Sequence, residues 1–448
     1  MASVTHAATA PRTSRLRSLD GLRGVAAVVV LVHHALLTVP SLAAAYYPSA
    51  GPAAGQPLLW LWTSSPLHLL WAGGEAVLLF FVLSGTVLTL PALRNPAFSW
   101  AAYYPRRLVR LYVPVLVAIA LAMVTIELLP RDSGANLGPW MAARPDGYSL
   151  EGLLRDLLLI DGVSRVVSPL WSLQWEVMFS LLLPIFVGFA MFVVRAPVAA
   201  AAMVTALVLL GSTFQEPIYF YLGTFAIGSL LAAVGPHVEA AAERVNGSRR
   251  AGTFWTAFLV VAVLATTSHW FTSPFGGGPA SPAPGFLSVV GVTMLVLAAW
   301  FCPALRGPLE GPVAQWLGRV SFSLYLVHEP IIIGLRHQFD VLPVWLTVLM
   351  AVALSFLVAA AFTRWVEVPS HHLAKKVGMA AQRLRQTVRL ELPPAAGPRT
   401  RLSWLEVPEV DLRARRLPPR HGAPAPGRPG QNRWSPVSRP VATGRAPR

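Results

Sequence analysis

The chain has 448 residues, of which 54% are hydrophobic and only 12% are charged. Soluble globular domains average about 25% charged residues, so this composition excludes an ordinary soluble protein and is typical of a membrane protein. The mean hydropathy of +0.56 agrees with that assignment. With a single cysteine, Cys302, the chain can form neither an intrachain disulfide nor a thiolate zinc cluster, and no metal site is expected.

The net charge of +16 is concentrated at the C-terminal end. The segment from Lys375 onward contains 14 arginines, two lysines and four acidic residues, which gives it a net charge of +12. The same region is rich in proline and poor in aliphatic residues, a composition that buries too little surface to fold. We therefore expect a transmembrane domain over 1–372 and a disordered basic cytoplasmic tail over 373–448. This tail is expected to associate with anionic lipid headgroups and not with nucleic acid.

Stretches of about 20 mostly apolar residues, long enough to cross a hydrocarbon core of roughly 30 Å, recur along the chain. The first follows an arginine-containing leader and is too long for a cleaved signal peptide, so we expect it to be retained. Ten such stretches predict an all-α polytopic protein with about ten transmembrane helices. They lie at 21–40, 68–93, 108–129, 170–193, 197–213, 217–234, 254–271, 285–302, 315–336 and 342–364.

The distribution of arginine orients these spans. If the N-terminus is inside, the outer loops 41–67 and 272–284 contain neither lysine nor arginine. The four arginines of the outer loop 130–169 are offset by five acidic residues. Because cytoplasmic loops carry the excess of positive charge, the sequence predicts both termini in the cytoplasm of a multi-pass cell-membrane protein.

The first span, SLDGLRGVAAVVVLVHHALL at 18–37, keeps several ionisable residues. Arg23 and His34 are 11 residues apart, which places both on one face of a helix and about 16 Å apart in depth. Asp20 is expected to pair with Arg23 at the helix start, whereas His33 is turned about 100° away. Ionisable groups within a span are costly and mark a functional interior. The alternative is that Arg23 reaches lipid headgroups and His34 bonds a neighbouring helix.

Later spans repeat this pattern at a similar depth. Each residue also has a purely structural explanation, since serine in spans serves close helix packing and a glutamate can lie at the interface. Taken together, they predict a polar chamber inside the helix bundle. The residues concerned are Glu75 and Ser84 in 71–91, Glu176 in 169–184, and Tyr325 and His328 in 317–333.

A basic cluster, Arg106, Arg107 and Arg110, lies in YPRRLVRLYVP at the predicted cytoplasmic mouth. Guanidinium groups bind phosphate through paired hydrogen bonds. Alternatively, these arginines could serve only to set the orientation of the spans in the membrane. Below a polar chamber, the cluster favours a phosphate-rich cytoplasmic ligand whose reactive end reaches upward. A coenzyme A ester has that shape.

Six motifs now appear in a fixed order between about residues 15 and 370: LDGLRG with His34, FFVLSG, RRLVRLYVP, LWSLQWEVMF, GRVSFSLYLVHEP and WVEVP. In this order they resemble the acyltransferase 3 family of integral membrane O-acyltransferases. The resemblance implies a ten-span enzyme that takes an acyl group, often acetyl, from cytoplasmic acyl-CoA. It further implies that the acyl group goes to a hydroxyl of a glycan, a lipid-linked sugar or a small metabolite.

By position, Arg23 and His34 match the arginine and histidine that the family pairs, and Glu176 matches its mid-membrane glutamate. Arg106, Arg107 and Arg110 match the family's basic cluster, and Tyr325, His328 and Glu367 match its late motifs. The chain departs from the family pattern at Thr86, Ala76, Leu78 and Ser180. These departures concern the expected shape of the acceptor pocket more than the chemistry.

O-acylation needs a base for the acceptor hydroxyl, and His34 is the expected base, with Glu176 and Asp20 as the other expected catalytic residues. Glu176 would either orient the imidazole of His34 or bind the acceptor, and Ser84 is a less favoured covalent nucleophile. The competing hypothesis is a proton-coupled exporter of a glycan or metabolite, which also uses buried glutamate and histidine. The inverted repeats and paired broken spans of transporters are not seen in the sequence. Release of free CoA would distinguish the two, because an exporter consumes no thioester.

Overall fold

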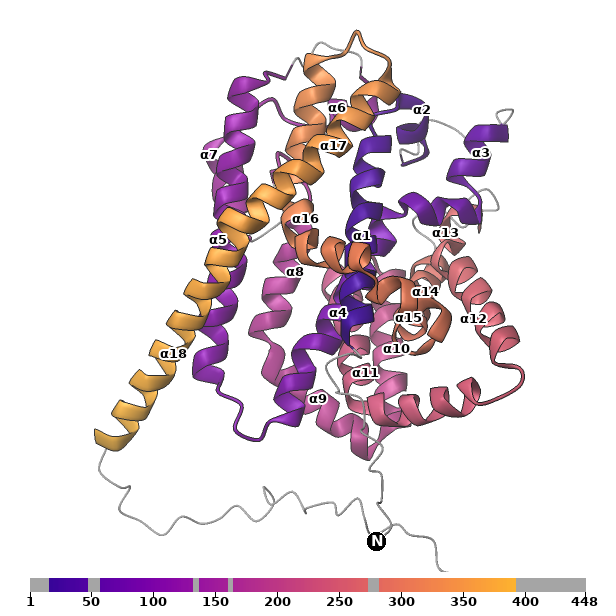
Figure 1. Ribbon diagram of the computed structural model, residues 1–448, viewed down its shortest axis with the longest axis vertical. Coiled ribbons are helices and arrows are strands. Elements are labelled where there is room, and N and C mark those ends of the chain that lie inside the picture. Colours follow the sequence, from indigo (N-terminus) through magenta and orange to yellow (C-terminus); the bar gives the residue numbers. More distant parts are fainter. Residues whose placement is uncertain (1–15, 47–56, 132–136, 160–163, 273–281, 392–448) are drawn as a thin grey trace, which may run out of the picture. The chain divides into compact units, whose positions relative to one another are not determined.

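The computed structural model describes residues 16–46, 57–131, 137–159, 164–272 and 282–391. Within these ranges the chain is helical and contains no β-strand, so the predicted all-α class is confirmed (Figure 1). The long helices are α1 (Arg17–Leu36), α4 (Gly73–Arg94), α5 (Trp100–Leu128), α10 (Pro197–Thr213), α11 (Pro217–Asn246), α12 (Ala251–Thr266), α14 (Pro282–Phe301), α16 (Pro312–Gln338), α17 (Val344–Phe362) and α18 (Val368–Glu391).

Shorter helices connect and cap the long ones. They are α2 (Pro40–Ala43), η2 (Ala44–Tyr46), α3 (Pro57–Thr63), η4 (Pro66–Trp71), α6 (Pro139–Ala142), α7 (Leu150–Leu158) and α13 (Ser268–Thr272). Two further pairs of consecutive helices are bent, namely α8 (Leu170–Leu181) with α9 (Leu183–Arg195), and α14 with α15 (Pro303–Glu310). The bends measure 67° and 79°. Pro184 and Pro303 lie in the first turns of α9 and α15, where a missing N–H group interrupts the helix.

Five helical segments of the described chain are long and apolar enough to cross a membrane. They are Arg17–Leu36, Gly73–Arg94, Trp100–Leu128, Pro217–Asn246 and Val344–Thr387, and the count is seven if each bent pair forms one span. The other three of the ten predicted ranges fall on α10 and α12, which are shorter apolar helices, and on α16. The protein is therefore a multi-pass membrane protein with five to seven spans by length and composition.

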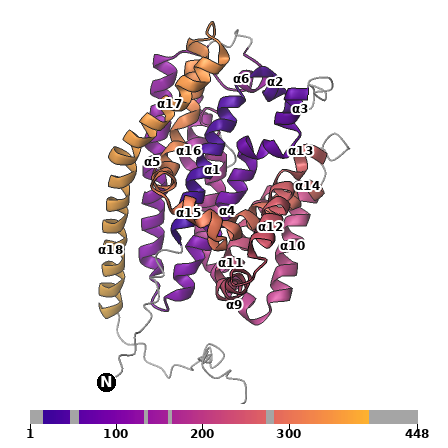
Figure 2. The ribbon, with the colours of Figure 1, turned by 45° about the vertical axis from the view of Figure 1, so that its right-hand side comes forward.

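Helix α1 lies between two apolar clusters of the core. α1 packs with α4 and α14 in one cluster and with α16 and α17 in the other. In Figure 2, α5 and α18 lie on one side of α1 and α16, and α10, α12 and α14 lie on the other. The residues of α1 therefore reach both halves of the bundle.

Glycines allow α1 and α16 to approach at backbone distance. A Cβ added to Gly24 would lie 2.7 Å from the Leu317 Cβ, and one added to Gly318 would lie 2.9 Å from the Asp20 carbonyl carbon. Small residues at such a crossing let two membrane helices pack closely. This contact sets the height at which the polar residues of α1 meet those of α16.

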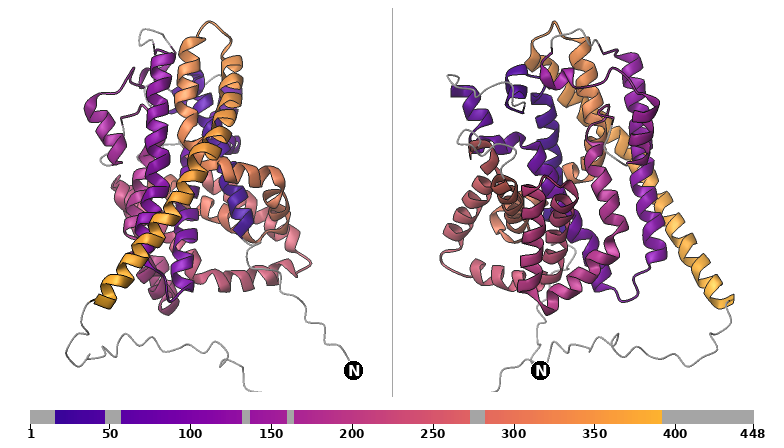
Figure 3. Two further views of the ribbon diagram at one scale, coloured as in Figure 1. Left: turned by 60° about the vertical axis from the view of Figure 1, so that its left-hand side comes forward. Right: turned by 180° about the vertical axis from the view of Figure 1, so that it is seen from behind.

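The expected start of the tail at residue 373 falls inside the last described helix. After α17, the π-helical turn η6 (Thr363–Glu367) leads into α18, so residues 373–391 are helical and not disordered. The reason is packing, because α18 runs along α5 (Figure 3) and Ala374 and Gly378 are buried between them. A Cβ on Gly378 would lie 2.9 Å from the Ala102 carbonyl oxygen. The remainder of the predicted tail, 392–448, lies outside the described residues.

Candidate active site

A cavity of about 180 Å³ opens between α1, α4, α5, α8 and α16. Its polar lining combines two kinds of group, charged side chains and hydroxyls. The polar side chains are Asp20, Arg23, Ser84, Arg107, Arg110, Ser172, Glu176, Ser321 and Tyr325. Its apolar wall includes Phe80, Phe81, Leu83, Leu111 and Phe322. Five separate helices thus contribute polar side chains to one cavity.

Arg23 points from α1 toward α16. Its Nε donates a hydrogen bond of 3.0 Å to the Ser321 Oγ, and one terminal nitrogen donates a bond of 3.1 Å to the Gly318 carbonyl. The expected pair with Asp20 is not among the ion pairs of the described residues, because the guanidinium is turned to α16. Asp20 lines the cavity beside it as an exposed carboxylate.

The three arginines of the predicted basic cluster separate on folding. Arg107 forms an ion pair with Glu176 and donates a hydrogen bond of 3.0 Å to the Ser180 Oγ. Arg110 lines the cavity. Arg106 lies on the α18 side of the helix, with its Nε 3.3 Å from where a Cβ on Gly378 would lie. Of the three arginines, only Arg107 and Arg110 therefore reach the cavity.

Glu176 is held from two sides in the cavity wall. Besides its ion pair with Arg107, it accepts a hydrogen bond of 3.1 Å from the Ser84 Oγ. Both members of the pair are nearly buried, with side chains 11% and 12% exposed. The side-chain partners of Glu176 are therefore Arg107 and Ser84. The imidazole of His34 forms its hydrogen bond with a different residue.

That residue is His328 of α16. The His34 Nδ1 lies 2.7 Å from the His328 Nε2, and the ring centroids are 5.0 Å apart. Neither ring lines the cavity itself. Tyr325, however, lines the cavity one turn before His328, and these two rings are 6.2 Å apart. The histidine pair is therefore adjacent to Tyr325 of the cavity lining.

His33 is buried in a different environment from its neighbour. Its Nδ1 lies 2.9 Å from the Trp71 carbonyl oxygen and 3.3 Å from the Tyr46 hydroxyl. Its ring also packs on those of Tyr46 and Trp71. The helix therefore gives the two adjacent histidines separate sets of contacts.

Glu75 does not join the chamber. The Trp270 Nε1 donates a hydrogen bond of 2.8 Å to its carboxylate, and the Trp270 ring stacks on His68 at 3.9 Å. Tyr46 bonds the His68 Nε2 at 2.9 Å and completes this outer aromatic cluster. The predicted grouping of Glu75 with Ser84 and Tyr325 is therefore not found among the described contacts, since Glu75 is about two and a half turns before Ser84 along α4.

Two departures from the expected motif pattern lie outside the cavity lining. Thr86 is fully buried and donates to the carbonyl oxygens of Val82 and Gly228, where α4 meets α11. Ser180 accepts the Nε bond of Arg107. Both residues support helix packing around the cavity and do not line it.

Two groupings near the cavity escaped the sequence reasoning. In the first, Glu329 accepts hydrogen bonds of 2.5 Å from both the backbone N–H and the Oγ of Ser168, and pairs with Arg144 at 3.2 Å. The Arg144 guanidinium in turn lies 4.4 Å from the Trp140 ring centroid. These partners come from a predicted outer loop and from α16, so no local pattern links them.

The chain between Arg144 and Ser168 also contains a set of hydrogen bonds around Asp156. Its carboxylate accepts hydrogen bonds from the backbone N–H and the hydroxyl of Ser164, both at 2.7 Å, and from the Tyr148 hydroxyl at 2.9 Å. Burial raises the pKa of the Asp156 carboxyl, while the bonds from Ser164 oppose that rise. The same burial raises the pKa of the Tyr148 phenol.

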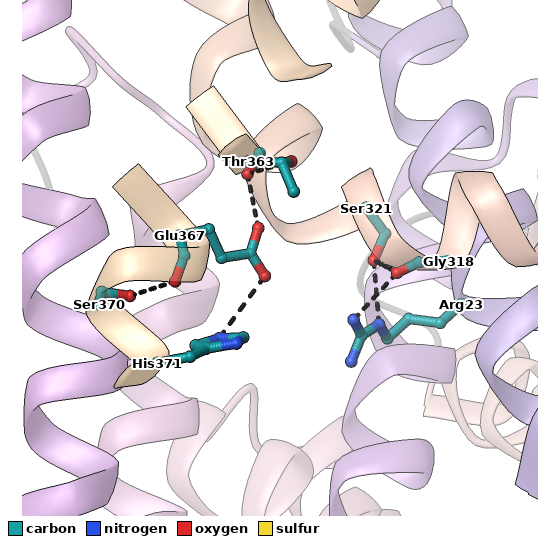
Figure 4. A network of polar contacts seen from close by, with 8 residues as sticks. Arg23, Gly318, Ser321, Thr363, Glu367, Ser370 and His371 are labelled. Carbon is teal, nitrogen blue, oxygen red and sulfur yellow. Dashed lines mark hydrogen bonds and ion pairs between the residues drawn. The ribbon is translucent and has the colours of Figure 1, made fainter. Parts of the chain in front are cut away.

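The second grouping surrounds the π-helical turn. Glu367 accepts a hydrogen bond of 2.5 Å from the Ser323 Oγ, and the His371 Nε2 lies 3.8 Å from its other carboxylate oxygen. In Figure 4 the Glu367 carboxylate and the Arg23 guanidinium point toward each other from opposite helices. The WVEVP motif was a sequence signal for Glu367, and single-turn π-helices often occur at functional sites.

Comparison with known proteins decides the family. Residues 16–364 match the profile of the acyltransferase 3 family, described as an acyltransferase domain. The chain belongs to this family. The predicted resemblance is confirmed. No solved structure was found to match the chain.

Three relatives are similar over much of the chain. A candidate peptidoglycan O-acetyltransferase, YrhL of Bacillus subtilis (strain 168), is 27% identical over 60% of this chain and 46% of its own length. The O-acetyltransferase PaAT-1 of Phomopsis amygdali is 26% identical over 71% of this chain and 72% of its own. The peptidoglycan O-acetyltransferase OatA of Listeria monocytogenes is 24% identical over 79% of this chain and 55% of its own. The chain thus spans about half the length of the two bacterial relatives.

Proposed function

We propose that the protein moves an acyl group, specifically acetyl, from cytoplasmic acyl-CoA to a hydroxyl of a cell-envelope glycan, a glycolipid or a glycosylated metabolite. The observation that carries the proposal is the cavity with cationic groups at its wall. Among the described residues, neither Arg23 nor Arg110 forms an ion pair, yet both line this cavity. Guanidinium groups without a carboxylate partner suit the phosphates of a CoA ester.

The position of the histidine pair supports a reaction at the far end of the same cavity. The cavity lining runs from Arg23 and Arg110 to Tyr325, and His328 follows one turn later on α16. A donor whose phosphates contact the arginines would extend its thioester toward the two imidazoles. We assign the proton transfer to His34, because an imidazole can accept and release a proton near neutral pH.

The proposed step conserves all atoms and protons. His34 accepts the proton of the acceptor hydroxyl while the hydroxyl oxygen attacks the thioester carbonyl carbon. The tetrahedral oxyanion then collapses, the C–S bond breaks, and the CoA sulfur leaves and takes up the proton from His34. The new ester bond joins the acyl group to the acceptor oxygen.

The acceptor and the topology belong to the same proposal. Two of the three relatives are named for peptidoglycan, which supports a glycan or a glycosylated compound as the acceptor. We assign ten spans, with α10, α12 and α16 added to the five helices and two bent pairs, and both termini in the cytoplasm of the cell membrane. The basic segment 392–448 would then lie near anionic headgroups of the inner leaflet.

Free CoA release tests the donor. Purified protein in nanodiscs is mixed with acetyl-CoA and candidate hydroxyl acceptors, and the free thiol is measured with a chromogenic disulfide. Wild-type protein is expected to release CoA in an acceptor-dependent manner, and the His34→Ala protein much less. Transport of a labelled glycan without any thioester consumption would support the exporter and contradict the proposal.

Mass spectrometry of envelope glycans and metabolites after gene deletion would identify the acceptor by its lost acyl mass.

A further inference from the structure

The His328 ring forms a hydrogen bond within its own helix. Its Nδ1 lies 2.8 Å from the Leu324 carbonyl oxygen, one turn earlier on α16. A carbonyl oxygen can only accept a hydrogen bond, so the His328 Nδ1 must carry the proton. Because this contact is local to one helix, it does not depend on a bound ligand.

The state of His328 determines that of His34. A neutral imidazole protonated at Nδ1 has its lone pair at Nε2, and the His328 Nε2 lies 2.7 Å from the His34 Nδ1. The His34 Nδ1 must therefore be the donor of this bond. Its own lone pair is then at Nε2, for which the described residues provide no hydrogen-bond partner.

We infer that His328 is a positioning residue that holds His34 in the Nδ1–H tautomer, so that the His34 Nε2 is the atom that accepts the substrate proton. The inference rests on the proposed role of His34 as the base. It adds the identity of the basic nitrogen and the residue that selects it. A second imidazole takes the place that a carboxylate has in many histidine-based sites.

The surroundings of His328 explain why a neutral imidazole can hold the tautomer of His34. His328 is 1% exposed, and Glu329, the neighbouring carboxylate, is occupied by Ser168 and Arg144. The titratable or charged groups that act on His34 are His33, His328 and Arg144, and Arg144 is paired with Glu329. A neutral donor–acceptor pair avoids placing a net charge in the interior of the bundle.

Aromatic contacts restrict the remaining motion of the His34 ring. The Trp140 ring centroid lies 5.8 Å from that of His34, with the planes tilted by 30°. On another side, His33 meets the ring edge-on at 5.1 Å. The hydrogen bond to His328 therefore selects the tautomer in a ring whose position is already confined.

Kinetics provides the first test. His328→Leu removes the acceptor, and His328→Gln offers an amide oxygen near the position of the Nε2. For His328→Leu, we expect kcat for CoA release to fall about 10- to 100-fold, as for other residues that orient a catalytic histidine, with KM for acetyl-CoA nearly unchanged. His328→Gln is expected to recover most of kcat. His237→Leu, at an exposed position on α11, makes the same chemical change away from the site and should behave as wild type.

Nitrogen-15 spectra of histidine-labelled protein provide a second test that needs no activity. The His34 ring nitrogens, assigned by their loss in His34→Gln, should show a single neutral tautomer protonated at Nδ1. In His328→Leu, the same signals should shift toward a mixture of tautomers. If His328→Leu does not fold, the wild-type spectrum and the His328→Gln kinetics still decide the question.

The outcomes separate this inference from the proposed function. An Nε2–H tautomer of His34 in the wild type would overturn the inference, and so would full activity of His328→Leu in a protein whose His34→Ala variant is inactive. A His34→Ala protein that releases CoA normally would instead overturn the proposed base, whatever the tautomer.

Discussion

Arg107 on α5 and Glu176 on α8 form an ion pair in the wall of the cavity, where the sequence predicted a donor-binding arginine and a catalytic glutamate. The pair also draws in Ser84 from α4 and Ser180 from α8. Three helices are therefore joined at one point beside Arg110, which lines the same cavity. Arg107 is thus paired within the protein, whereas Arg110 is available to a ligand.

Breaking this pair should cost stability. In Glu176→Leu, we expect the nearly buried Arg107 to lose its partner at a cost of roughly 3 kcal/mol, the scale for removing one member of a buried pair. The double variant Arg107→Leu with Glu176→Leu should be less destabilised than the sum of the single changes. Denaturant titration in a mild detergent measures all four proteins. Strictly additive losses would show that the two side chains do not interact.

The adjacent histidines should respond differently to alanine. His34→Ala removes the proposed base, so turnover should fall by about 10²- to 10⁴-fold while acetyl-CoA still binds. His33→Ala removes the partner of the buried Trp71 carbonyl and should lower stability by about 1–3 kcal/mol, with a much smaller loss of turnover. Calorimetric binding of acetyl-CoA, CoA release and thermal unfolding are compared for both. An essential His33 and a dispensable His34 would contradict the assignment.

We expect Arg23 to affect the binding affinity for the donor more than the rate of acyl transfer. Arg23→Ala removes a cation from the cavity wall, so donor affinity should weaken by roughly 1.5–3 kcal/mol, the range for hydrogen bonds to charged groups. Arg195→Ala is a suitable control because that arginine ends α9 and does not line the cavity. Calorimetry with acetyl-CoA measures both. Unchanged affinity in a folded Arg23→Ala protein would remove Arg23 from the proposed donor site.

A glycine contact between α4 and α11 should not tolerate a methyl group. A Cβ on Gly85 would lie 2.9 Å from the Gly228 Cα, closer than real Cβ atoms come, so Gly85→Ala should push the helices apart and lower the melting temperature. Gly188→Ala, on α9, meets no atom within 4 Å and should be neutral or stabilise by about 0.5–1 kcal/mol. Thermal unfolding in detergent compares the two. A Gly85→Ala protein as stable as Gly188→Ala would contradict the close approach.

The basic segment should be dispensable for the chemistry. A chain ending at Glu391 keeps all of α18 and should retain acyl transfer in detergent, since 392–448 contains none of the motif residues. A chain ending at 366 lacks Glu367 and the whole of α18 and should be impaired. CoA release and size-exclusion profiles measure both truncations. Loss of activity in a folded 1–391 protein would assign a role to the segment.

The sequence alone located the helices and one face of α1. Apolar runs interrupted by charge are a local property, so the all-α class and most of the helical ranges could be read directly. The spacing of Arg23 and His34 also fixes their angle about one helix axis, whatever packs against it. That is why both were expected on one side and His33 on another, and why their contacts now differ accordingly.

Tertiary structure decided which polar residues meet. Asp20 and Arg23 are close in sequence and do not pair among the described residues, because the glycine crossing of α1 and α16 places Ser321 within reach of the guanidinium. Residues 373–391 were expected to belong to the disordered tail, but they are helical because Ala374 and Gly378 pack against α5 in spite of the polar composition.

Pairs of polar residues on different helices depend on how those helices cross, which no local pattern encodes. The bonds of Arg107 to Glu176 and of His34 to His328 each join two helices that are remote in sequence. A buried polar group must find a partner wherever packing brings one, since leaving it unpaired costs more than the bond itself contributes. The residue types were therefore visible in the sequence, while their pairing was settled only by the packed bundle.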